Sequence, residues 1–136
     1  MPDRPRRLLL VDANDQWRVA WAAELATLGW IVDEAQDVRT AIDSAIRLQP
    51  QVILTNTHLP DANGYHFVRT LRGVVEDDVV VVGLVTSTDV GDNIARAGFD
   101  FILREPFDFS VFRRKGTDST EDDDRPTLPA PSRRNQ

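Results

Sequence analysis

A polar side chain follows each of several short apolar runs in this sequence, an arrangement that is often found at binding or catalytic sites. The residues concerned are Asp12, Asn56, Thr86 and the adjacent pair Arg104 and Glu105. If the runs are strands of one parallel sheet, these side chains gather at its carboxyl edge, where such sheets usually bind ligands. We therefore place the candidate site at this edge.

The common enzyme motifs are missing from the chain. No glycine-rich phosphate loop follows the first apolar run, and no set of Ser, His and Asp is evident. The sequence has no cysteine, which excludes thiolate metal sites, disulfides and a cysteine nucleophile. Its two histidines, His58 and His66, stand near each other without an evident set of further ligands, so we interpret them as surface residues. We expect no enzyme activity, no cofactor and no metal.

The apolar pattern alternates between strands and helices along the chain. Strands are expected at residues 7–11, 30–35, 52–54, 79–85 and 101–103. The first helix is expected to be capped by Asp15 and ended by Gly29, and the second ends before Pro50. A later helix is expected from about Thr86 to Ala97.

The last helical segment is unusually short. Pro106 breaks the fifth strand, and residues 108–114 leave room for only about two helical turns. Alternating strands and helices with right-handed crossovers predict an α/β fold. The fold is a five-stranded parallel sheet with helices on both faces, and its last helix is short.

The composition fits one domain followed by a tail. The 136 residues are 41% hydrophobic and carry a formal net charge of −6, which disfavours nucleic-acid binding by the domain. No stretch approaches the roughly 18 apolar residues of a membrane span, so we expect no membrane association and a cytoplasmic location. Residues 1–114 form the predicted domain, and residues 115–136 read as a disordered, acidic and proline-rich tail.

Several segments carry a resemblance that extends over most of the chain. They are Leu8-Leu9-Leu10-Val11-Asp12, Gly29-Trp30, Pro50-Gln51-Val52-Ile53-Leu54, His58-Leu59-Pro60-Asp61-Ala62-Asn63-Gly64, Thr86, Ala97-Gly98 and Glu105-Pro106-Phe107. In this order and spacing, residues 7–112 resemble a receiver domain of bacterial two-component response regulators. The resemblance implies a flavodoxin-like sheet with strand order 2-1-3-4-5 and a role in signal transduction.

The residues that the resemblance assigns to phosphotransfer are mostly changed. Receivers phosphorylate an aspartate at the end of the third strand, where this chain has Asn56. A second acid that helps to hold Mg²⁺ is replaced by Ala13, and the lysine that neutralises the phosphoryl oxygens is replaced by Glu105. The aromatic switch residue is replaced by Ile102. The resemblance therefore implies a degenerate receiver, or pseudo-receiver, whose acyl-phosphate chemistry is lost.

The remaining polar residues of the pocket suggest a hydrogen-bond network. We hypothesise that the Asn56 amide donates to Asp12 or Glu105 and that Thr86 donates to the other carboxylate, in place of the metal and the lysine. The alternative is that these side chains are partly solvated and have no role.

The leading functional hypothesis is an interaction module that works without phosphorylation, with a protein partner of a signalling pathway or a second copy of the chain. One alternative is a small-molecule sensor that uses the altered pocket, and another is a conventional phosphoacceptor that works with substituted ligands. An enzyme of the haloacid-dehalogenase type is disfavoured because Asn14 stands where that chemistry needs a second acid.

The resemblance also implies an interaction face. It comprises Arg96, Phe101, Arg104, Phe107, Phe109 and Phe112. The competing interpretation is that the phenylalanines at 101, 107 and 112 belong to the core. Trp17 and Trp21 recur at helical spacing, and we interpret both as packing residues, although Trp17 is near enough to the pocket rim to cover it.

Overall fold

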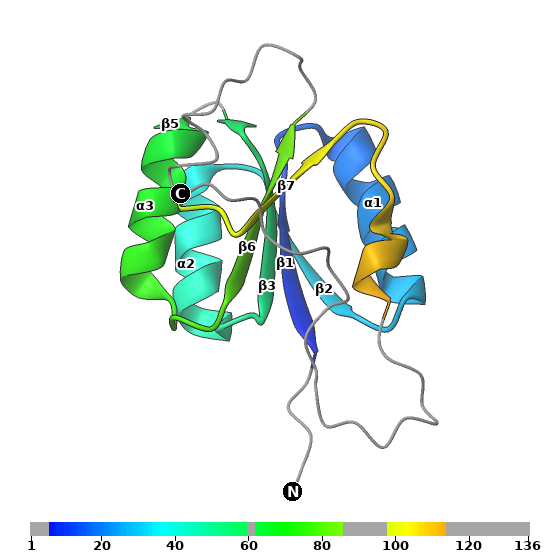
Figure 1. Ribbon diagram of the computed structural model, residues 1–136, viewed down its shortest axis with the longest axis horizontal. Coiled ribbons are helices and arrows are strands. Elements are labelled where there is room, and N and C mark those ends of the chain that lie inside the picture. Colours follow the sequence, from blue (N-terminus) through cyan, green and yellow to red (C-terminus); the bar gives the residue numbers. More distant parts are fainter. Residues whose placement is uncertain (1–5, 60–61, 86–97, 114–136) are drawn as a thin grey trace, which may run out of the picture.

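The computed structural model describes residues 6–59, 62–85 and 98–113 of the chain (Figure 1). Its centre is a parallel sheet of five strands in the order β2-β1-β3-β6-β7. The strands are β1 (Arg7–Val11), β2 (Ile31–Ala35), β3 (Val52–Asn56), β6 (Val80–Val85) and β7 (Phe101–Arg104). This order confirms the predicted 2-1-3-4-5 topology, and the strand bounds agree with the expected ones to within two residues.

Among the described residues, three α-helices lie between the strands, and a short 3₁₀ helix follows the last strand. They are α1 (Asp15–Thr27), α2 (Val38–Leu48), α3 (Gly64–Val74) and the 3₁₀ helix η1 (Phe109–Phe112). A two-stranded antiparallel ribbon, β4 (His58–Leu59) with β5 (Ala62–Asn63), follows the end of β3. The helix expected between about Thr86 and Ala97, and the tail at residues 115–136, lie outside the described residues.

Helices cover both faces of the sheet. In Figure 1, α2 and α3 lie on one side, and α1 and η1 lie on the other. Side chains alternate between the two sides along each strand, so Leu9 and Val11 of β1 join the core under α2 and α3, while Leu8 and Leu10 join the core under α1. β1 and β3 are buried almost throughout, as expected for inner strands of a parallel sheet.

The start of α1 differs from the sequence prediction. Asn14, not Asp15, is the N-cap, because the Asn14 side chain accepts a hydrogen bond from the backbone N–H of Trp17 at 2.9 Å. Asp15 is the first helical residue, where its negative charge still favours the helix N-terminus. The predicted stop at Gly29 is present, with a φ of 104° that a side chain rarely adopts.

The last described segment lies on the core beside α1. η1 occupies only four residues, yet Phe109 and Phe112 are 1% and 0% exposed. The indole N–H of Trp30 donates to the backbone carbonyl of Phe112 at 2.6 Å, which ties this segment to the start of β2. Both phenylalanines therefore belong to the core under α1, although η1 is short.

No helix among the described residues has both the length and the apolar content needed to cross a membrane.

Candidate functional site

Asp12 lies at the end of β1 and is almost completely buried, with 2% of its surface exposed. One carboxylate oxygen, Oδ1, accepts the backbone N–H of Asn14 at 2.8 Å. The other, Oδ2, accepts the side-chain N–H of Asn56 at 3.0 Å. Donors therefore reach both oxygens of the buried carboxylate, which offsets the cost of removing it from water.

Asn56 ends β3, directly beside β1 in the sheet. Its bond to Asp12 confirms the first half of the predicted network. The second half required Thr86, which lies outside the described residues. The Asn56 side chain donates to Asp12 through its amide N–H group. An ionised aspartate at this position would have no such donor, because a carboxylate only accepts hydrogen bonds.

Ile102, which the resemblance assigns to the aromatic switch, packs against Gly83 of β6. A Cβ added to Gly83 of β6 would approach the Ile102 Cδ1 atom to 2.9 Å and Thr57 Cγ2 to 3.2 Å. A side chain at Gly83 would therefore force the Ile102 side chain to shift and would crowd Thr57. Ile102 is partly buried and contacts the core under α2 and α3.

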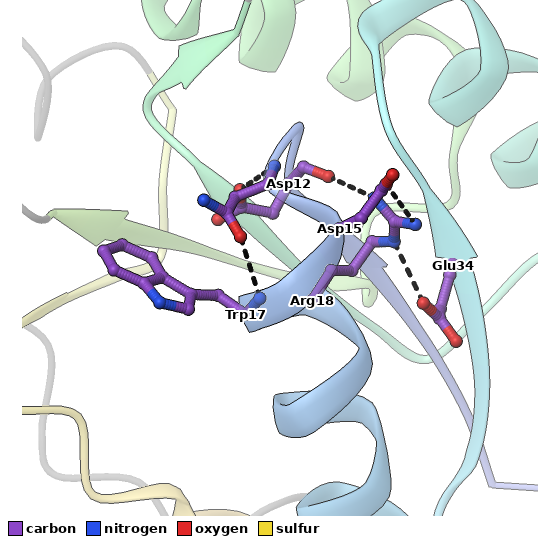
Figure 2. Close-up of polar contacts among 6 residues, drawn as sticks. Asp12, Asp15, Trp17, Arg18 and Glu34 are labelled. Atoms are coloured by element: carbon purple, nitrogen blue, oxygen red, sulfur yellow. Dashed lines mark hydrogen bonds and ion pairs between the residues drawn. The ribbon is translucent and has the colours of Figure 1, made fainter.

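An arginine on α1, which the sequence analysis did not single out, connects three elements of the site. Arg18 donates through Nη1 to the backbone carbonyl of Asp12 at 2.8 Å (Figure 2). It also pairs with Glu34 of β2 at 2.9 Å and with Asp15 at 2.8 Å. Its side chain is only 12% exposed. Arg18 therefore fixes the start of α1 against the ends of β1 and β2.

Electrostatics in this cluster favour the charged arginine. Burial alone would lower the pKa of Arg18, but hydrogen bonds to Glu34 and Asp15, with their negative charges, outweigh it and raise the pKa. Two features of the sequence could have indicated these ion pairs of Arg18. One is the spacing of three between Asp15 and Arg18, and the other is the acid Glu34 near the end of the second strand. Neither signal specifies the contact across to β2.

Glu105 follows β7 and lies at the surface. Its backbone N–H donates to the carbonyl of Val85 at 3.2 Å, which continues the pairing of β7 with β6. Its side chain is exposed and lines a cleft with Trp17, Trp21 and other residues of α1 and the segment after β7. The closed part of the site is thus the bonded pair Asp12 and Asn56, whereas Glu105 lines an open cleft whose lining includes neither of them.

The proposed interaction face is only partly at the surface. Phe109 and Phe112 are core residues, so their assignment to that face was wrong. Phe101 and Phe107 are partly buried and pack on the core under α1, whereas Arg104 is exposed. Arg96 lies outside the described residues. Trp17 is 46% exposed, so its interpretation as a packing residue was largely wrong.

The described part of the chain contains no group of three or more acidic or histidine side chains arranged to hold a metal ion. Ala13 is exposed and offers no ligand beside Asp12. The closed part of the site is therefore a hydrogen-bonded cluster built on one carboxylate.

Comparison with known proteins agrees with the fold. A family model described as the response regulator receiver domain matches residues 8–115. Response regulator MprA of Mycolicibacterium vanbaalenii is 30% identical over 105 residues, which are 76% of this chain and 45% of that protein. The probable transcriptional regulatory protein TcrX of Mycobacterium tuberculosis is 33% identical over 107 residues, with the same coverage. The chain spans about half the length of these curated relatives.

Solved structures show the same architecture. A CheY-like receiver domain from Methylobacillus flagellatus has a TM-score of 0.71 at 22% identity, covering 79% of this chain and 92% of that one. The receiver domain of a sensor histidine kinase from Pseudomonas aeruginosa, described with a magnesium ion coordinated in its active-site cleft, has a TM-score of 0.68 at 29% identity. It covers 77% of this chain and is itself 88% covered. The chain belongs to the response regulator receiver domain family of two-component signalling.

Proposed function

We propose that this receiver domain is a pseudo-receiver, which signals through protein contacts without being phosphorylated. The observation that carries the proposal is the side chain of Asn56 at the phosphoacceptor position, donating to the buried carboxylate of Asp12 at 3.0 Å. An amide oxygen is a much weaker nucleophile than a carboxylate oxygen. An amide that donates into the pocket also cannot form the acyl phosphate on which a receiver switch depends.

The residues present do not fit the Mg²⁺ ion that receiver domains hold at this edge. Magnesium needs hard oxygen ligands in near-octahedral order and is usually held by one or two carboxylates together with phosphate oxygens and water. Here Asp12 supplies one carboxylate, already bonded to two donors, and Ala13 supplies none. The Asn56 N–H group carries a partial positive charge toward Asp12, where a cation would need an acceptor.

The charge at the end of β7 gives separate support. Receivers place a lysine at the position of Glu105, and a carboxylate there repels a phosphoryl group instead of neutralising it. Glu105 is exposed and lines the surface cleft, so in this chain the position faces possible partners.

The proposed partner is another protein of a signalling pathway, and a second copy of the chain is the alternative partner. The net charge of −6 disfavours nucleic acid as a ligand of the domain itself. The lack of cysteine suits a reducing compartment, and we place the protein in the cytoplasm. The longer curated relatives are described as response regulators and transcriptional regulators, so this domain could act within a larger regulator.

The proposal is tested by exposing the chain to acetyl phosphate and Mg²⁺ and measuring its intact mass. We expect no phosphoryl adduct on the wild-type chain. The matched control is the triple variant Ala13→Asp, Asn56→Asp and Glu105→Lys, which restores the three changed groups and should gain one adduct. An adduct on the wild-type chain at the level of the control would overturn the proposal.

A further inference from the structure

A surface cleft of about 480 Å³ lies between α1 and the segment that follows β7. We call it the aromatic-acidic cleft, because of the side chains that line it. They are Trp17, Trp21, Glu24, Glu105, Pro106, Phe107 and Phe109. The lining contains two acidic residues and no basic one within the described part of the chain. The cleft shares Glu105 with the receiver pocket but is otherwise distinct from it.

Trp21 is the centre of the aromatic lining. Its ring centroid lies 5.3 Å from that of Phe107 and 5.8 Å from that of Phe109, in edge-on arrangements. The Trp17 ring is tilted against it, with the centroids 5.8 Å apart. Phe109 is buried, so this ring cluster is anchored in the core. Trp17, at 46% exposure, presents much of its indole to solvent. Exposed indole rings attract cations through their negative faces.

The two acidic side chains of the cleft are available for a partner. Glu24 and Glu105 are both exposed, and neither carboxylate has a hydrogen bond or an ion pair among the described residues. Glu24 comes from α1 and Glu105 from the end of β7, so the charges border the aromatic lining from two elements. Two like charges beside aromatic rings favour a positively charged occupant.

We infer that the aromatic-acidic cleft docks an arginine side chain of a protein partner. A guanidinium group is planar and stacks on aromatic faces, while its five N–H donors suit carboxylates at the rim. Tryptophan and arginine are also the residue types that most often dominate protein interfaces. The half-exposed Trp17 leaves the cleft open at the surface, which suits a side chain presented by a protein. The inference rests on the proposed function, because it names the surface that an interaction module would use.

The test uses a hexa-arginine peptide, with a hexa-citrulline peptide of the same length that lacks the charge. Binding is followed through the indole N–H signals of Trp17 and Trp21 in NMR spectra of the full chain. We expect saturable shifts with hexa-arginine and none with hexa-citrulline. The double variant Glu24→Gln and Glu105→Gln should bind about tenfold more weakly, since two rim charges are lost.

A matched control separates the cleft from the general attraction of an acidic protein. Glu76 is an exposed acid in the turn between α3 and β6, so a Glu76→Gln and Asp77→Asn double variant loses the same charge elsewhere. Its affinity for hexa-arginine should stay within about twofold of the wild type. Equal weakening by both double variants, equal binding of hexa-citrulline, or no shift of either indole would each overturn the inference.

Failure of this inference is distinguishable from failure of the proposed function. The phosphoryl adduct reports on Asn56 and Asp12, whereas the peptide titration reports on the two indoles of the cleft. A wild-type chain that gains a phosphoryl adduct contradicts the pseudo-receiver proposal, whether or not it binds hexa-arginine. A chain that gains no adduct and does not bind hexa-arginine contradicts only the docking site.

Discussion

The substitution Asn56→Asp tests the role of the hydrogen bond between Asn56 and Asp12. In the wild type, the donor nitrogen lies 3.0 Å from the Asp12 carboxylate oxygen. The variant places a second carboxylate there, and two like charges about 4 Å apart repel by about 4 kcal/mol at an effective dielectric constant of about 20. Because one pKa unit corresponds to about 1.4 kcal/mol, the apparent pKa of the carboxyl pair should rise by about three units.

This repulsion predicts that the variant loses stability as pH rises. The pair has a higher pKa in the folded chain than the roughly 3.9 of an unfolded aspartate, so the folded form binds more protons between the two values. The penalty is absent below about pH 4 and complete above about pH 7. Urea unfolding, with the wild type measured at each pH, should give a deficit of about 3 to 4 kcal/mol at about pH 8 and a much smaller one at about pH 4.5.

The control for Asn56→Asp is Gln16→Glu, the same change of amide to carboxylate at an exposed position of α1. We expect it to shift the free energy of unfolding by less than about 0.5 kcal/mol at either pH. If Asn56→Asp were as stable as this control at about pH 8, the two side chains would not be in close contact. The account of the closed part of the site would then be wrong.

Two further substitutions and one titration test other contacts of the fold. Trp30→Phe removes the donor to the buried Phe112 carbonyl and should cost about 1 to 3 kcal/mol in urea unfolding. Arg18→Gln breaks two ion pairs and a carbonyl contact at a mostly buried side chain, and should also cost about 1 to 3 kcal/mol. Asp37 is the N-cap of α2, and the hydrogen bonds that it accepts from Thr40 lower the pKa of its carboxyl group. The stabilising effect of this cap should therefore disappear only below about pH 4, which a carboxyl NMR titration would show.

Each of these predictions has a comparison variant on the same chain. Trp17→Phe alters a half-exposed indole and should lower the free energy of unfolding less than Trp30→Phe does. Equal losses would contradict the hydrogen bond from Trp30 to the Phe112 carbonyl of η1. Arg47→Gln breaks an exposed pair with Asp43 and should change stability by less than about 0.5 kcal/mol, unlike Arg18→Gln. Asp37→Asn keeps the cap without the titrating group, so an unchanged acid dependence would contradict the assignment.

The sheet could be predicted from the sequence because its signals are local and consistent. The runs around Leu9, Ile53 and Val82 are long enough and apolar enough to be inner strands, and the structure buries all three residues completely. The order of the strands came from a resemblance spread over many motifs. The hydrogen bond from Asn56 to Asp12 could be anticipated because parallel strands bring their carboxyl ends to one edge.

Features that depend on contacts between distant segments were missed. The choice between Asn14 and Asp15 as N-cap depends on where α1 starts relative to Asp12, which composition does not determine. The core position of Phe109 requires knowing that the chain folds back beside α1. The contact of Arg18 with β2 joins residues 16 positions apart. Such features follow from three-dimensional packing, which neither the apolar periodicity of a sequence nor its motifs specify.

The central claim is that this receiver domain does not work as a phosphorylation switch, and an NMR titration tests it most directly. Amide signals of the full chain are followed as Mg²⁺ and then beryllofluoride, a mimic of the acyl phosphate, are added. The account predicts no saturable shift at Asp12, Asn56 or Glu105 at millimolar Mg²⁺, and none on adding beryllofluoride. Saturable shifts that begin at these residues and spread along β7 would contradict it, because the altered ligands would then support a working switch.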